Sequence, residues 1–165
     1  MPPSPPTPPS PPSRSSPSHP REPVLVGRPI TLEALADVAR RGRAVAFDAD
    51  ARARVVRSRE AIDAIAAAGD EGPRVSGVNT GFGALSETRI STSDVRQLQK
   101  NLVRSHSTGV GPDLSVPEVR GMMLLRAQVL ALGCSGVRPE LVDVLLAMLE
   151  RRVHPRIPAQ GSVGA

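Results

Sequence analysis

The chain has 165 residues, a formal net charge of +5 and 39% apolar residues. This length is typical of about one domain, and the apolar content allows a hydrophobic core. A basic chain can bind nucleic acid by neutralising phosphates. The arginines are dispersed, however, and two Phe with no Tyr or Trp leave almost no rings on which bases could stack. We therefore exclude a nucleic-acid partner.

The residues that bind metals or form disulfides are few. Cys134 is the only cysteine, so it forms no intrachain disulfide and fits a reducing compartment; we expect it to be a small buried residue. His19, His106 and His154 have no metal-ligand spacing with it, so no metal site is predicted. No run approaches the ~18 apolar residues of a membrane span, and the start lacks the apolar core of a secretory signal. The sequence predicts a cytoplasmic protein without a membrane partner.

Residues 1–23 contain eleven of the 18 prolines. Such a Pro/Ser-rich stretch buries too little apolar surface to offset the entropy of ordering, so it is predicted to be a disordered leader. It could be a polyproline II ligand for an aromatic groove, or a passive extension, which we favour. Residues 24–165 are predicted to form the folded part.

Two helices are predicted first. Thr31 can cap a helix that runs through Arg40 and ends before Gly42, with an apolar set of Leu32, Leu35, Val38 and Ala39. A second helix begins after Asp48 or Asp50 and runs towards Ala68. Residues 72–92 follow without any period and are rich in Gly, Ser and Thr, which indicates a loop that forms a pocket wall.

Three further helices complete the pattern. The first begins at Ser91 or Asp94 and continues until Gly109 breaks it, so that His106 lies near its C-terminal end. Ser115 opens a capping box and a helix to Leu132. This helix is apolar nearly all round, which predicts burial on several sides. Pro139 starts the last helix, with Val142, Leu145, Leu146 and Leu149 inward and Arg151 and Arg152 near its C-terminal dipole. No strand has convincing alternation, so the fold is predicted to be mainly α.

Gly77–Gly83 reads Gly-Val-Asn-Thr-Gly-Phe-Gly. Its glycine spacing fits neither the dinucleotide fingerprint nor the P-loop, and no predicted strand leads into it. Nucleotide binding is therefore rejected for this motif.

Three ordered blocks resemble the aromatic amino acid ammonia-lyases. They are Gly77–Gly83, the stretch from Leu98 to Gly111, and Cys134–Pro139 followed by Val153–Pro158. The resemblance extends from about Val24 to Ala165. Within the second block Ser105 and His106 are similar to histidine ammonia-lyases, whereas phenylalanine-specific and tyrosine-specific relatives tend to carry Phe-Leu and His-Leu pairs. The resemblance implies the N-terminal part of a helical fold that assembles as a homotetramer.

The resemblance also implies a reaction. It is the non-oxidative elimination of ammonia from L-histidine to give urocanate, with methylidene-imidazolone (MIO) as an electrophile that forms from an Ala-Ser-Gly tripeptide. Ala165 matches the Ala of that tripeptide, and the Ser and Gly are not among the 165 residues. We therefore expect that this chain does not form MIO by itself and is inactive by itself.

Site residues follow from the same resemblance. His106 is expected to help hold the substrate imidazole, and Asn79 and Gly83 to line the substrate site. The family's tyrosine base directly precedes the glycine block, where this chain has Ser76. A serine hydroxyl without a neighbouring base accepts a proton poorly, so base transfer is expected to be impaired.

Two other interpretations stay open. A phenylalanine or tyrosine ammonia-lyase, or an aromatic aminomutase, would share the glycine block and the Ala165 end, but is not expected to carry Ser105 and His106. A non-catalytic helical remnant or interaction module would instead bind partners through its proline-rich leader and fold as a monomer.

Overall fold

The structure of the chain is a computed structural model that describes residues 22–69, 72–75, 77–81, 87–88, 90–91 and 93–161. Nearly all of the predicted leader, residues 1–23, lies outside these residues, so its disorder stays a prediction. Among the described helices, none combines the length and the apolar character that a membrane crossing requires.

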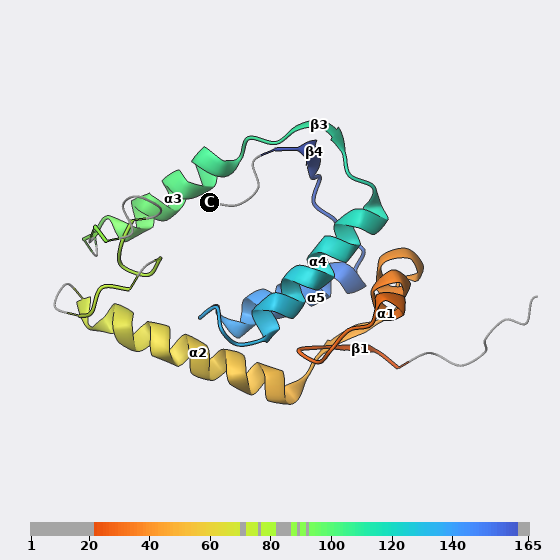
Figure 1. Cartoon of the computed structure of the whole chain (residues 1–165), viewed down its shortest axis with the longest axis horizontal. Helices are drawn as coiled ribbons and strands as arrows, with labels where there is room; N and C mark the ends of the chain where they lie inside the picture. Colours follow the sequence, from red (N-terminus) through yellow and green to blue (C-terminus); the bar gives the residue numbers. More distant parts are fainter. Residues whose placement is uncertain are drawn as a thin grey trace, which may run out of the picture.

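The described elements are mostly helical, which confirms the predicted fold class. The helices are α1 (Leu32–Ala36), the π-helical turn η1 (Asp37–Arg41), α2 (Ala49–Ala67), α3 (Val95–His106), α4 (Val116–Ala131) and α5 (Pro139–Glu150). The strands are β1 (Val24–Val26), β2 (Val45–Phe47), β3 (Val110–Asp113) and β4 (Pro158–Gln160). In Figure 1, α4 and α5 lie side by side at the centre, and α2 runs along one edge.

The core forms where α4 packs against α5, η1 and β1. Its fully buried side chains include Leu124, Val142 and Leu149, together with Val26 and Val38 from the N-terminal elements. Burial of each such side chain stabilises the fold by roughly 1.5–3 kcal/mol. Because Val142, Leu146 and Leu149 are buried and Leu145 packs against the core, the predicted inward face of α5 is confirmed.

The first helix begins as predicted but continues differently. Thr31 caps it, since its Oγ1 accepts a hydrogen bond from Ala34 N at 3.1 Å. After Ala36 the chain makes a π turn, and Gly42 ends it with a φ of 72°. The prediction that Leu32 faces the core is wrong, because it is 81% exposed. A π turn holds more residues than an α turn, so the apolar positions do not follow one α-helical stripe.

The second helix begins at the predicted cap. Asp48 Oδ1 accepts a hydrogen bond from Ala51 N at 3.0 Å, and Asp48 Oδ2 accepts one from Arg28 Nε at 2.5 Å. The bond from Ala51 and the Arg28 guanidinium lower the pKa of Asp48 below its ordinary value. Val55 on this helix is buried.

Four short strands correct the expectation that the chain has none. β1 pairs with β2 in parallel, with Val24 opposite Val45. β3 pairs with β4 in antiparallel fashion, with Val110 opposite Gln160. Strands of three or four residues are too short to show an alternating pattern, and these form through pairing between segments that are distant in the sequence.

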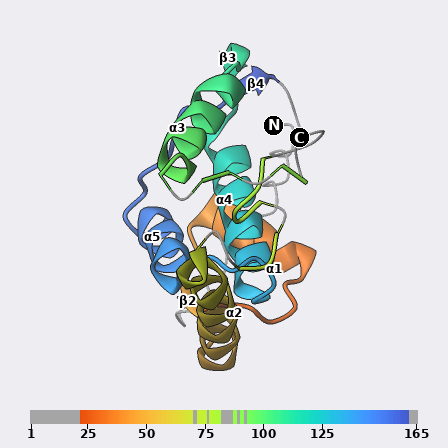
Figure 2. The ribbon, with the colours of Figure 1, turned by 90° about the vertical axis from the view of Figure 1, so that its left-hand side faces the viewer.

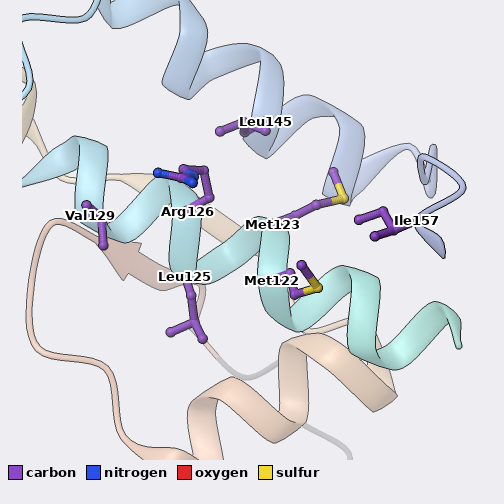
Figure 3. Close-up of a pocket in the computed structure, with 7 residues that line it drawn as sticks. All are labelled: Met122, Met123, Leu125, Arg126, Val129, Leu145 and Ile157. Carbon is purple, nitrogen blue, oxygen red and sulfur yellow. The ribbon is translucent and has the colours of Figure 1, made fainter. Parts of the chain in front are cut away.

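Helix α4 begins with the predicted capping box, in which Ser115 N donates to Glu118 Oε2 at 2.8 Å. The expectation of burial on several sides is wrong. Its packed face is covered by η1 and α5, but Met122, Leu125 and Val129 on the other face are 47–50% exposed. They line an apolar groove of about 540 Å³, whose far wall includes Leu145 and Ile157 (Figure 3).

The turn between α4 and α5 packs against α2. Gly133 has a φ of 81°, and a Cβ built on it would lie 2.8 Å from Arg54 Cβ and 2.9 Å from Arg54 C. A Cβ on Gly136 would lie 2.3 Å from Ile62 Cγ1. Cys134 lies between these glycines and is exposed, so the expectation that it is buried is wrong. Contact through glycine backbone leaves the intervening side chain facing outward.

Gly133→Ala is expected to lower the free energy of unfolding by about 2 kcal/mol. The new Cβ would clash with the α2 backbone, and alanine is strained in the left-handed conformation of this position. Gly69→Ala is the matched control. Gly69 also has a positive φ, of 57°, but no atom of the described residues lies within 4 Å of its Cβ position. Urea unfolding of both variants separates the two effects. Equal losses would contradict the close approach of the turn to α2.

Candidate active site

Asn79 lies in the glycine-rich loop, and its side chain closes that loop. Its Oδ1 accepts a hydrogen bond from Val75 N at 2.8 Å, and its Nδ2 donates to Pro73 O at 2.9 Å. Next to it, the Oγ1 of buried Thr80 accepts from Gly77 N at 3.3 Å. The oxygen and the nitrogen of the Asn79 side-chain amide are therefore both hydrogen-bonded to the backbone of this loop.

A cavity of about 250 Å³ lies beside Asn79, between the end of α2 and the start of α3. Ile65 and Val95 line it with apolar surface, and Arg96 adds a positive charge. The loop was predicted to form a pocket wall, and Asn79 and Val78 do line this cavity.

His106 is the last residue of α3 and is exposed. Its Nδ1 lies 2.9 Å from Leu102 O. A carbonyl oxygen can only accept, so Nδ1 carries the proton in the neutral ring and Nε2 is the acceptor. Ser105 Oγ lies 3.0 Å from the same Nδ1 and donates to Leu102 O at 3.0 Å. The end of α3 thus fixes the orientation of the ring and leaves Nε2 without a hydrogen bond to any described residue.

The structure does not bring His106 and the Asn79 cavity together. That cavity touches the first turn of α3 at Arg96, whereas His106 ends the helix. His106 follows Arg96 by ten positions, which corresponds to about 15 Å along the helix axis.

The β3–β4 pair instead brings the end of the described chain to Gly109, three residues after His106. A Cβ on Gly161 would lie 3.3 Å from Gly109 Cα, and one on Gly109 would lie 3.0 Å from Pro158 Cγ. Leu114 N also donates to Ile157 O at 2.8 Å. Gly161, which leads to Ala165, therefore lies against the chain three residues after His106, and α3 and β4 lie at the same end of the molecule (Figures 1 and 2).

This pairing was not predicted from the sequence. The only available signal was two glycines, at 109 and 111, in a stretch that must approach another backbone closely. Three predicted site residues, Ser76, Gly83 and Ala165, lie outside the described residues.

His154 contacts a buried arginine. Arg120 Nη1 donates to His154 Nε2 at 3.1 Å, so this nitrogen is unprotonated. Among the described residues, no group of three His, Cys, Asp or Glu side chains could hold a metal ion.

Residues 30–165 match the family described as aromatic amino acid lyase. The chain belongs to this family. It is 66% identical over 142 residues to a histidine ammonia-lyase from Sorangium cellulosum (strain So ce56), in a match that covers 86% of this chain and 28% of that protein. The chain thus spans little more than a quarter of the length of this relative.

Solved structures of the aromatic amino acid lyase family have the same fold. Tyrosine aminomutase from Streptomyces globisporus superposes with a TM-score of 0.78 at 37% identity, over 86% of this chain and 26% of that one. Histidine ammonia-lyase from Trypanosoma cruzi superposes with a TM-score of 0.73, also at 37% identity and over the same shares of the two chains. The helical fold inferred from the sequence is therefore confirmed as that of the ammonia-lyases and aminomutases.

Proposed function

We propose that this chain is the N-terminal part of a histidine ammonia-lyase, which eliminates ammonia from L-histidine to give urocanate. The observation that carries the proposal is His106, whose ring is oriented by Leu102 O. In support, Gly109, three residues after His106, lies against Gly161 near the end of the described chain. The identity of 66% to a histidine ammonia-lyase supports this substrate over other aromatic amino acids.

His106 would bind the substrate side chain. A neutral imidazole with its proton on Nδ1 offers Nε2 as an acceptor, and the imidazole N–H of L-histidine is a donor of matching size. A phenyl ring has no such donor, and a tyrosine substrate would instead place a hydroxyl there. The fixed tautomer therefore favours a substrate whose ring carries a hydrogen-bond donor over phenylalanine, and the identity to a histidine ammonia-lyase supports histidine rather than tyrosine as that substrate.

The electrophile expected in this family is MIO, which makes the amine a better leaving group when it is present. Ala165 is the residue of this chain that would contribute to it, and the 165 residues hold no Ser-Gly after it. We propose that turnover requires a polypeptide in which that tripeptide is complete.

We also propose that the exposed apolar face of α4 packs against the part of the enzyme that this chain does not span. Met122, Leu125 and Val129 leave apolar surface uncovered among the described residues (Figure 3). The relatives carry almost three quarters of their length outside the match. Assembly as a cytoplasmic homotetramer belongs to the same proposal.

The test is a chimera in which residues 1–165 are followed by the remaining part of the Sorangium cellulosum relative. It is expected to release urocanate from L-histidine. His106→Leu is expected to lower kcat/KM for L-histidine about 10- to 100-fold, because the substrate imidazole loses one hydrogen bond in a closed site. Steady-state assays with L-histidine, L-phenylalanine and L-tyrosine measure both effects.

His106→Gln is the matched control, since its amide oxygen can still accept a hydrogen bond; it is expected to retain more activity than His106→Leu. The structural similarity to tyrosine aminomutase supplies the second candidate function. Conversion of L-tyrosine to an isomeric amino acid, faster than release of urocanate from L-histidine, would favour that candidate and reject the first.

A further inference from the structure

Arg120 is a buried cation whose hydrogen-bond partners are all neutral. Its side chain lies between α4, η1 and the end of α5, and the residue is 6% exposed. Nε donates to Val38 O at 3.0 Å, and Nη1 donates to Leu149 O at 2.9 Å and to His154 Nε2 at 3.1 Å. No carboxylate of the described residues pairs with it. A buried charge without a counterion is costly, so an anion that reached this guanidinium would be stabilised.

A cavity of about 160 Å³ opens beside this guanidinium. Arg40, Arg152 and His154 line it together with Arg120, and Val116 and Pro117 place the first turn of α4 against it. No Asp or Glu is among its described lining residues. The amino end of α4 adds the partial positive charge of a helix N-terminus, part of which the Glu118 carboxylate in its capping box offsets. Positive groups therefore surround the cavity on several sides.

The charges around the cavity repel one another. Burial and then the charge of Arg152 lower the pKa of Arg120 below its ordinary value. The nearest acidic group of η1 is Asp37, and it is already paired with Arg41 and Arg43. A cavity lined by several arginines, with no acid among its described lining residues, gains from a bound anion, because the arginines that face it then acquire a counterion.

We propose that the cavity between η1, the start of α4 and Arg152 binds a small oxyanion, held by Arg120 and Arg152. The shared chemistry is that of a phosphate or a carboxylate group. Arg120 Nη2 makes no hydrogen bond to a described residue and can donate to the anion, and Arg152 adds a second, exposed guanidinium. This site is distinct from His106, so it does not depend on the proposed reaction.

Calorimetric titration with inorganic phosphate tests the site, with chloride at matched ionic strength as the reference anion. Both the 165-residue chain and the Sorangium chimera are titrated, so that the test can be made even if only one of the two polypeptides folds. Arg152→Gln is expected to weaken phosphate binding tenfold or more, and Arg40→Gln to weaken it less, because Arg120 and Arg152 supply the main contacts. Arg57→Gln is the control, since Arg57 is exposed on α2 and does not line the cavity.

Binding by the shorter chain that disappears in the folded chimera would identify the natural occupant as a carboxylate from the rest of the protein. Binding by both would identify a free oxyanion such as phosphate. Heat no larger than that of chloride in either polypeptide would overturn the proposal. So would an equal loss of affinity in Arg57→Gln and Arg152→Gln, because the effect would then be one of net charge alone.

Discussion

Arg120→Ala is expected to lower the free energy of unfolding by about 3–5 kcal/mol, the largest stability effect that we predict. The arginine supplies the donors for two carbonyl oxygens at helix ends, Val38 O in η1 and Leu149 O in α5. Each buried carbonyl left unpaired costs about 1–3 kcal/mol, and removal of the long side chain adds a cavity term. Release of a desolvated charge offsets part of this loss.

Urea unfolding at neutral pH measures the effect. Arg126→Ala is the matched control, because Arg126 lies on the same helix, is exposed, and its removal is expected to cost less than 0.5 kcal/mol. Arg120→Lys should recover only part of the stability, since an ammonium cannot reproduce the planar fork that reaches two carbonyls in different helices. Similar unfolding midpoints for the Arg120→Ala and Arg126→Ala variants would mean that the buried arginine does not join the helix ends.

Ser76→Tyr is expected to raise kcat of the Sorangium chimera about 10²- to 10⁴-fold. The reason is the general-base step, which contributes this much when a suitable group is positioned at the reacting proton. In the family that this chain resembles, the position that matches Ser76 holds a tyrosine that acts as the base. A serine hydroxyl accepts a proton poorly without a partner. Position 76 lies outside the described residues, so the prediction rests on the sequence motif that follows it. Urocanate release from L-histidine is the measurement.

Ser76→Phe distinguishes the effect of the tyrosine hydroxyl as a base from the effect of an aromatic ring at this position. It supplies the same aromatic volume without the hydroxyl, so its kcat should stay near that of the Ser76 chimera. Equal gains from Tyr and Phe would show that packing at this position matters and that proton transfer does not. No gain from either would remove position 76 from the catalytic step.

Local sequence signals predicted the helices well. Thr31 and Asp48 begin α1 and α2 through side-chain caps, and the capping box at Ser115 begins α4. These contacts join residues three positions apart, so their energy depends little on the rest of the fold. The same local character explains why the end of α3 at His106 was predicted within a few residues.

The candidate site was only partly accessible from the sequence. The motifs selected Asn79 and His106, but the structure places them at opposite ends of α3. In addition, the side-chain amide of Asn79 is hydrogen-bonded to the backbone of the loop that contains it. A motif indicates which residue types a family requires, whereas the distance between two motifs depends on how the intervening helix is packed.

By itself, the sequence determined the helical class, the helix ends and the family resemblance, because each depends on short stretches of residues. Only the tertiary structure decided that β3 meets β4, that one face of α4 stays exposed and that Arg120 is buried beside a cavity whose described lining includes several arginines and no acid. These features join residues tens of positions apart. Their energies come from burial and from pairing between elements, which no local pattern encodes.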